Sequence, residues 1–176
     1  GLTPQEWGAS PSLAVLDPDG RLDLFICNYV HFGPKVQPQL CFFPAADDKN
    51  KKIKSSCGPK YYQPIKATVW RNAGNGRFED KSVPWGATQH TGKGLGSAAV
   101  DFDGSGNDSL AIANDEVAGN LFHNEGGGKL KDIAVEANVA YDRDGNIHAG
   151  MGIDWGDYDN DGKFDLGGTT VRDESK

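Results

Sequence analysis

A short acidic segment constrains the fold of this chain more than any other feature. Residues 157–165 read DYDNDGKFD, which places carboxylates at loop positions 1, 3, 5 and 9 and a glycine at position 6. Ca²⁺ takes roughly six to eight oxygen ligands, and alternate acidic residues on a tight turn bring such oxygens together. Gly162 permits the sharp reversal, because glycine adopts positive φ without strain. The alternative interpretation is a solvated acidic turn.

We therefore predict a calcium site in this loop. The predicted ligands are the carboxylates and one backbone carbonyl, from Asp157, Asp159, Asp161, Lys163 (backbone O) and Asp165. An EF-hand would need a bidentate glutamate at position 12 and a helix on each side, but position 12 is Gly168. The preceding segment 150–156, GMGIDWG, is too rich in glycine for a helix. Its alternation of small and large residues predicts strand, loop, strand.

A second feature is internal repetition, which is typical of solenoids and propellers. Residues 71–80, RNAGNGRFED, recur as HNEGGGKLKD at 123–132, and a large apolar pair precedes each copy. Each copy predicts a β-hairpin with a tight turn. His123 aligns with Arg71, and for this position we predict a surface or inter-blade polar contact rather than catalysis. Trp70, Phe122 and Trp155 stand at repeat-consistent apolar positions and are predicted to pack in a core.

The acidic loop also recurs, in two less complete copies. Residues 17–24, DPDGRLDL, match loop positions 3 to 10, but Val15 occupies position 1, which predicts a weaker metal site with ligands Asp17, Asp19, Arg21 (backbone O) and Asp23. Residues 101–110, DFDGSGNDSL, have serine at positions 5 and 9. This copy is the most doubtful metal site, and its candidate ligands are Asp101, Asp103, Ser105, Asn107 (backbone O) and Ser109.

The first repeat is longer than the second by about thirty residues, and we assign the surplus to an insertion near 34–64 that contains Cys41 and Cys57. A disulfide between these two cysteines would close a loop of 16 residue steps. On the loop-entropy argument it would contribute about 3 kcal/mol, and it would place the protein outside the reducing cytosol. Cys27 lies in an apolar run and is predicted to be a buried, inert thiol.

Composition favours an all-β fold and excludes some partners. The chain has 24 glycines and 9 prolines, with 37% hydrophobic residues, which is typical of short strands joined by many turns. A net charge of −7 argues against a nucleic-acid partner, whose phosphates it would repel. No apolar run approaches the ~20 residues of a membrane span. The sequence shows no nucleophile paired with a base, and its four histidines fall at unrelated repeat positions.

A repeat of 52 to 56 residues has about the size of one four-stranded propeller blade. The acidic loop, its small-residue approach and the hairpin motif resemble the FG-GAP/VCBS repeats of integrin-α-type β-propellers. The resemblance is closest to the branch with ASPIC/UnbV domains, which includes cartilage acidic protein, because the segment from Tyr141 to Asp157 and the Cys57-Gly58-Pro59 tripeptide fit that branch. It implies Ca²⁺ held in D-x-D-x-D-G loops between neighbouring antiparallel strands of each blade.

The predicted architecture is a partial β-propeller over 1–176, with blade units at 8–85 (insertion 34–64), 86–140 and an incomplete 141–176. Propellers close with about four to eight blades, so two units and part of a third do not close a ring. We therefore expect either a fragment of a longer protein or a subunit that neighbouring chains complete. One departure from the family pattern is that Leu166 is followed by two glycines, where the family continues into an apolar strand.

Three functions follow from this resemblance. The first is an extracellular or periplasmic, secreted scaffold, stabilised by calcium, that recognises or adheres to a protein or glycan ligand. The second is a structural subunit of an extracellular filament or complex, completed by neighbouring chains. The third is part of an enzyme, since some polysaccharide lyases resemble calcium propellers of this type. A lyase would need a charged cleft with a lysine, histidine or tyrosine base.

Overall fold

A computed structural model describes residues 6–33, 36 and 39–171 of the chain. The described part is all-β and contains no α-helix, as its composition predicts. In chain order its elements are β1 (Gly8–Ala14), β2 (Asp23–Asn28), β3 (Leu40–Pro44), β4 (Lys52–Ser56), the short 3₁₀ helix η1 (Pro59–Tyr61), β5 (Thr68–Gly74), β6 (Arg77–Asp80), β7 (Gly94–Val100), β8 (Ser109–Asn114), β9 (Asn120–Asn124), β10 (Leu130–Asp132), β11 (Gly150–Gly156) and β12 (Asp165–Thr170). Within these residues, no helix has the length and apolar character needed to cross a bilayer.

The strands form the same antiparallel arrangement twice. The first sheet has the order β1-β2-β5-β6 and the second has the order β7-β8-β9-β10, so each is a meander in which neighbours along the sheet follow one another. The prediction of four-stranded antiparallel sheets is confirmed. β11 and β12 pair as a separate two-stranded hairpin, and β12 continues through both glycines that follow Leu166. The predicted order of strand, loop and strand around residues 157–165 is therefore correct.

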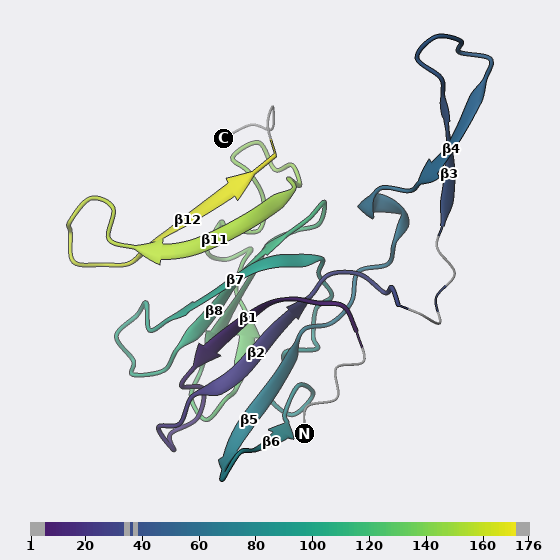
Figure 1. Ribbon diagram of the computed structural model, residues 1–176. Helices are drawn as coiled ribbons and strands as arrows, with labels where there is room; N and C mark the ends of the chain where they lie inside the picture. The colour runs from purple at the N-terminus through teal and green to yellow at the C-terminus, as the bar shows by residue number, and fades with distance from the viewer. Residues whose placement is uncertain (1–5, 34–35, 37–38, 172–176) are drawn as a thin grey trace.

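The second sheet lies between the first sheet and the β11–β12 hairpin (Figure 1). The first strands of the three units, β1, β7 and β11, lie next to one another, and small residues allow this close approach. A Cβ on Gly94 would come within 2.8 Å of Cys27 Sγ, and a Cβ on Gly96 would come within 3.0 Å of Gly152 Cα. The small-residue approach to each acidic loop therefore has a packing function.

Alternation along the central strands produces two separate cores, because successive side chains of a strand point to opposite faces. In β8, Leu110 and Ile112 pack toward the first sheet, where Phe25 and Phe122 place their ring centroids 6.3 Å apart. Ala111 lies between them in sequence and packs toward the hairpin instead. The second sheet is therefore buried on both faces, and Phe122 packs in the core as predicted.

The opposite core is smaller and lies under the β11–β12 hairpin. Its buried members come from the second sheet and from the segment that follows β10, and Trp155 of the hairpin stacks on Phe102 with ring centroids 5.6 Å apart. Trp155 therefore packs as the repeat position predicts. Trp70 does not join either core, because it faces the other side of the first sheet. The prediction of core packing for Trp70 is wrong, since in the described chain no sheet covers that face.

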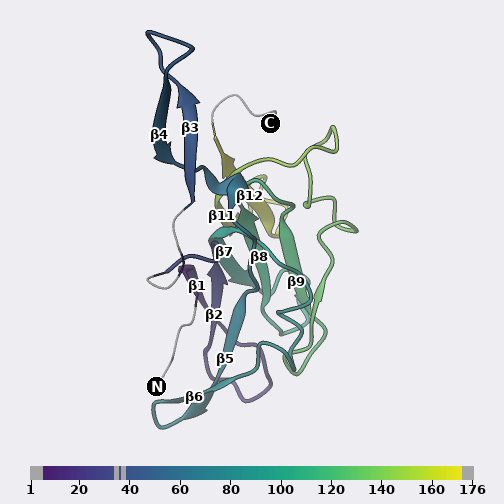
Figure 2. The ribbon, with the colours of Figure 1, turned by 90° about the vertical axis from the view of Figure 1, so that its right-hand side faces the viewer.

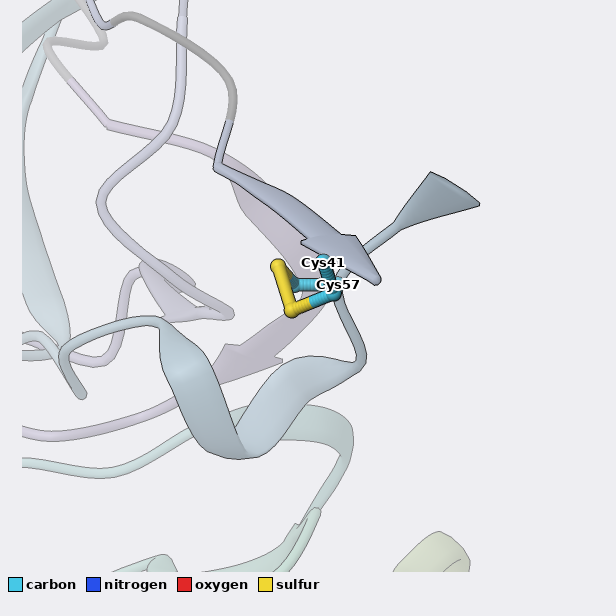
Figure 3. The surroundings of a disulfide bond; sticks show 2 residues. All are labelled: Cys41 and Cys57. Carbon is cyan, nitrogen blue, oxygen red and sulfur yellow. A yellow bond between two sulfur atoms is a disulfide. The ribbon is translucent and has the colours of Figure 1, made fainter. Parts of the chain in front are cut away.

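The insertion forms a β-hairpin that projects from the sheets (Figures 1 and 2). Its strands β3 and β4 pair in register from Leu40–Ser56 to Pro44–Lys52, and their side chains are largely exposed. The disulfide between Cys41 and Cys57 is confirmed, with 5.0 Å between the two Cα atoms (Figure 3). It closes the base of this hairpin beside η1. Cys27 is buried in the main core, as predicted.

Candidate metal-binding loops

The three acidic loops occupy equivalent places in the fold. Each connects the first two strands of its unit: residues 15–22 join β1 to β2, residues 101–108 join β7 to β8, and residues 157–164 join β11 to β12. The glycine at loop position 6 has positive φ in all three, at 73° for Gly20, 83° for Gly106 and 84° for Gly162. The repeated spacing therefore specifies one backbone reversal three times.

The third loop gathers three of its four predicted carboxylates. Oxygens of Asp157, Asp159 and Asp165 lie within 4.8 Å of one another, and all three residues are exposed. Backbone N–H groups set the directions of these side chains. The Asp157 carboxylate accepts hydrogen bonds from Asp161 N at 3.1 Å and Gly162 N at 3.0 Å, and Asp165 accepts one from Tyr158 N at 2.9 Å. Three clustered carboxylates on a fixed turn suit a hard cation such as Ca²⁺.

Asp161, the fourth predicted carboxylate, lies outside this cluster. Its Oδ1 accepts a hydrogen bond from Lys163 N at 2.8 Å, and its Oδ2 lies 3.4 Å from Lys163 Nζ. Both side chains of this ion pair are exposed, at 81% for Lys163 and 45% for Asp161. An ion pair at such exposure stabilises a loop very little, because water screens it. The three-carboxylate cluster itself receives no ion pair from a described basic side chain.

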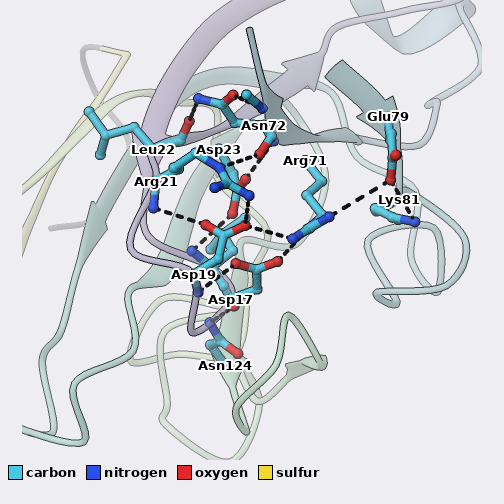
Figure 4. Close-up of polar contacts among 12 residues, drawn as sticks. Asp17, Asp19, Arg21, Leu22, Asp23, Arg71, Asn72, Glu79, Lys81 and Asn124 are labelled. Atoms are coloured by element: carbon cyan, nitrogen blue, oxygen red, sulfur yellow. Dashed lines mark hydrogen bonds and ion pairs between the residues drawn. The ribbon is translucent and has the colours of Figure 1, made fainter. Parts of the chain in front are cut away.

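The first loop holds an arginine against its carboxylates (Figure 4). Arg71 extends from β5, and its Nε lies 2.5 Å from Asp17 while its Nη2 lies 2.6 Å from Asp19. Arg21 adds a second guanidinium, with Nη2 2.5 Å from Asp19. The hydrogen bond that Arg71 donates to Asp17 raises the pKa of Arg71, and the pKa of Asp19 is lowered, first by the hydrogen bond that Arg21 N donates to it.

Asp23, at position 9 of the first loop, is fully buried. Its two oxygens accept hydrogen bonds from Leu16 N at 3.2 Å and Asn72 N at 2.8 Å. Burial raises the pKa of Asp23 in spite of these bonds. Asp165 is its counterpart in the third loop and also accepts a hydrogen bond from the position-2 amide, but its other oxygen receives no hydrogen bond from the described residues. Asp23, the first residue of β2, therefore links its loop to β5, the neighbouring strand in the sheet.

The second loop contains a histidine contact and an unpartnered oxygen. His123 Nε2 lies 2.7 Å from Asp103 Oδ2, and this hydrogen bond is the main cause that holds the pKa of Asp103 well below its usual range. Asp101 Oδ2 accepts a hydrogen bond from Gly106 N at 2.8 Å. Asp101 Oδ1 is buried and has no hydrogen-bond partner among the described residues. Ser105, a predicted ligand, accepts a hydrogen bond from Asn107 N at 3.3 Å.

Ser109 and Asp108 connect the second loop to other strands. Ser109 is buried and its Oγ accepts a hydrogen bond from Asn124 N at 3.1 Å, as Asp23 does from Asn72 N in the first sheet. In both sheets the residue at loop position 9 thus accepts a hydrogen bond from the equivalent strand, which is β5 in the first sheet and β9 in the second. Asp108, which the sequence analysis did not single out, accepts a hydrogen bond from Val15 N at 2.7 Å. This contact links the acidic loops of the first and second sheets.

Arg71 and His123 are the functional residues whose role the sequence analysis missed. Both stand at the same repeat position, and both contact the position-3 or position-5 acids of the loop in their own sheet. The contact of His123 with Asp103 is an exposed polar contact, as the first predicted alternative had it, and it lies within one sheet rather than between blades. Antiparallel pairing of β2 with β5 opposes Leu24 to Trp70, so the next residue of β5 reaches the loop. The signal was a basic residue repeated at one position.

A groove of about 600 Å³ lies on the free face of the first sheet. Its lining includes Ile26, Trp70 and Val83, with Lys66 and Glu6 among the charged residues. A volume of this size is within the range of small-molecule sites. The described residues that line it include no histidine or tyrosine. Of the three side chains that could serve as the base of a lyase, the described lining of this groove therefore offers a lysine alone, Lys66.

Comparison with known proteins adds no family to these observations. No protein-family profile matches the chain, and no curated protein matches its sequence. The donor sets of the loops can nevertheless be tested against Ca²⁺. The third loop fits the ion, because three exposed carboxylates converge there. The first loop does not fit it, because two guanidinium groups lie on its carboxylates.

Proposed function

We propose that this chain is part of a secreted, calcium-stabilised β-propeller that serves as a scaffold for recognition of, or adhesion to, a protein or glycan. The repetition of one four-stranded meander supports this proposal most directly. The two sheets and the final hairpin stack through their first strands, and each carries an acidic loop at the same place. This arrangement agrees with the resemblance to FG-GAP/VCBS repeats. The disulfide between Cys41 and Cys57 supports an oxidising, extracellular or periplasmic location.

Calcium in this proposal stabilises the third unit by joining the two ends of its loop. Asp157 and Asp159 follow β11, whereas Asp165 begins β12, so one ion bound to all three fixes the hairpin connection. In the absence of an ion, the three carboxylates repel one another. An ion that binds the folded state alone stabilises it by RT ln(1 + [L]/Kd), about 2.7 kcal/mol when calcium exceeds Kd by ~100-fold.

The calcium part of the proposal is tested by thermal unfolding in chelator and in millimolar Ca²⁺. Wild-type protein should unfold at a higher temperature in Ca²⁺, and Asp157→Asn should remove this increment. Asp154→Asn is the matched control, because Asp154 is an exposed aspartate of β11 that lies outside the cluster. Its carboxylate accepts a hydrogen bond from Trp155 N. The absence of any increment in the wild type, or its loss in the control, would overturn the calcium role.

The recognition part of the proposal is tested by binding of the calcium-loaded protein to arrays of glycans and of extracellular proteins. The first surface to test is the groove of the first sheet, where Trp70 offers an aromatic face beside Thr68 and Asp80. Trp70→Ala should weaken binding of a ligand held there. Tyr158→Ala removes an aromatic residue that is 91% exposed on the third loop and serves as control. Equal losses in both variants would place the binding surface elsewhere.

One alternative is supported by a specific observation, namely that two surfaces of the described chain lack a neighbouring sheet. The apolar groove lies on the free face of the first sheet, and β12 pairs with β11 alone. Such a face and edge suit a subunit that neighbouring chains complete. Light scattering of the calcium-loaded protein would then give a multiple of the 18.8 kDa chain mass. A folded monomer at high concentration would contradict the assembly.

A further inference from the structure

We propose that Arg71 takes the place of the metal ion in the first acidic loop, so that this loop does not bind calcium in the native protein. The resemblance implies a metal there, and the loop has the same spacing and the same positive-φ glycine as the third. Its donor set nevertheless differs from a metal site, because a positive side chain of the protein lies where the carboxylates converge. The inference concerns the first loop and stands whether or not the third loop binds calcium.

All six carboxylate oxygens of Asp17, Asp19 and Asp23 already accept hydrogen bonds. Asp17 accepts from Asp19 N and Arg71 Nε, and Asp19 accepts from Arg21 N and from both guanidinium groups. Asp23 accepts from Leu16 N and Asn72 N. In the third loop, by contrast, one oxygen each of Asp159 and Asp165 receives no hydrogen bond from the part of the chain that the structure describes. A calcium ion in the first loop would have to displace several of these donors.

The chemistry of arginine suits this role. A guanidinium keeps its charge at every physiological pH and presents five N–H donors in a plane, which lets it bond two carboxylates at once. Arg71 does so from a half-buried position, with 28% of its side chain exposed, and Asp17 is 10% exposed. Such charge-assisted bonds are stronger than exposed ion pairs because water screens them less. The loop also lacks a carboxylate at position 1, where Val15 N donates to Asp108.

Sheet geometry explains how the first loop receives this cation. β5 is the third strand of the first sheet, and it places Arg71 beside a loop that lies 54 residues earlier in the chain. The third unit has two described strands, β11 and β12, so no described residue stands in the position of Arg71. The cation of each loop is therefore determined by the strand that flanks it.

The decisive experiment removes the cation and asks whether a metal site appears. The starting protein is Asp157→Asn, in which the predicted third site is impaired, and Ca²⁺ binding is followed by calorimetry and by Tb³⁺ luminescence. Adding Arg71→Met should create binding that is at least roughly tenfold tighter than in Asp157→Asn alone. Asp17→Asn in the same background should abolish this gained binding. Lys81→Met is the matched control, because it removes an equal charge that contacts Glu79 outside the loop.

Two results would overturn the inference. One is Ca²⁺ binding by Asp157→Asn protein that Asp17→Asn abolishes, since native loop one would then hold the ion beside Arg71. The other is an Arg71→Met protein that is folded but gains no Ca²⁺ binding. If Arg71→Met does not fold, the Ca²⁺ binding of Asp17→Asn in otherwise native protein tests the inference. The inference requires that Asp17→Asn and wild type bind Ca²⁺ equally well. A wild type that binds no Ca²⁺ at all contradicts the proposed function and leaves this inference intact.

Discussion

The first and third acidic loops share a spacing and a backbone turn, yet their charges are balanced in different ways. In the first loop, Arg71 and buried backbone amides neutralise and orient the aspartates. In the third, three exposed aspartates converge, and Lys163 pairs with Asp161 outside the cluster. The shared spacing therefore specifies a turn and a set of acids. The neighbouring strand decides which cation the acids receive.

The second loop lies between these two extremes. His123 stands where Arg71 stands, but it contacts Asp103 alone, and one oxygen of Asp101 stays buried without a partner. A single imidazole offers fewer donors than a guanidinium, so it satisfies fewer oxygens. The three loops therefore form a series from an arginine, through a histidine, to no described basic side chain within the cluster.

The largest difference is expected at loop position 9. Asp23→Asn should lower the free energy of unfolding in chelator by about 3 kcal/mol. The side-chain NH2 group of asparagine cannot accept a hydrogen bond, so either Leu16 N or Asn72 N would lose its acceptor. Asp165→Asn should cost less than about 1 kcal/mol in chelator, because Asp165 is exposed. Urea unfolding of both variants measures the two costs. Equal losses would show that the two loops have the same structural role.

Hydrogen exchange should separate the loops by their response to calcium. With Ca²⁺ at about 100 times Kd, the amides of Asp161 and Gly162 should exchange about 100-fold more slowly than in chelator, because the ion must leave before the loop opens. The amide of Asn72, which donates to Asp23, should be equally protected in both conditions. Exchange followed by NMR or mass spectrometry provides the rates. Calcium-dependent protection at Asn72 would indicate an ion in the first loop.

The shared turn predicts an equal cost for alanine at loop position 6. Gly20 and Gly162 have φ of 73° and 84°, and an added Cβ would meet nothing within 4 Å at either position. Gly20→Ala and Gly162→Ala should therefore each cost about 1 kcal/mol in chelator, from backbone strain alone. Thermal unfolding of the pair checks this similarity. A much larger cost in one loop would mean that its turn depends on more than the backbone.

The smallest effect is expected in the second loop and depends on pH. Because the His123 hydrogen bond lowers the pKa of Asp103, its stabilisation is present above the usual aspartate value of 3.8 and is lost as pH falls below that value. His123→Ala should cost less than about 1 kcal/mol near neutral pH, since both side chains are about one-third exposed. The NMR titration of the Asp103 carboxyl should move toward 3.8 in this variant. His90→Ala, which removes an imidazole that is 55% exposed, is the control.

Much of the local structure could be predicted from the sequence because it depends on local chemistry. Alternate aspartates with a glycine at position 6 predict the acidic turns, and the RNAGNG motif predicts the β5–β6 hairpin, whose Asn75 and Gly76 both have positive φ, at 52° and 69°. The disulfide prediction depended on two cysteines that flank one polar insertion. Each of these features is defined within about twenty neighbouring residues, where spacing in sequence limits spacing in space.

Predictions that depended on a distant partner were less successful. Trp70 matches the apolar repeat position but lies on a face that no described sheet covers, so it lines a groove. Arg71 was aligned with His123 correctly, yet its contact with Asp17 depends on β5 lying beside β2. Asp161 stays a predicted ligand, and its carboxylate accepts a hydrogen bond from Lys163 N outside the three-carboxylate cluster. In each case the outcome depends on which atoms of other segments compete for the side chain.

The amino-acid sequence by itself determined the repeated strand-and-turn pattern, the three acidic reversals and the partners of the disulfide, because these follow from local backbone geometry and residue chemistry. The tertiary structure alone decided how each acidic loop is neutralised. Aspartates at equal spacing are chemically alike until the sheet brings a guanidinium to the first loop and an imidazole to the second. Electrostatic energy depends on distances between atoms in space, and those distances are set by strand pairing rather than by separation along the chain.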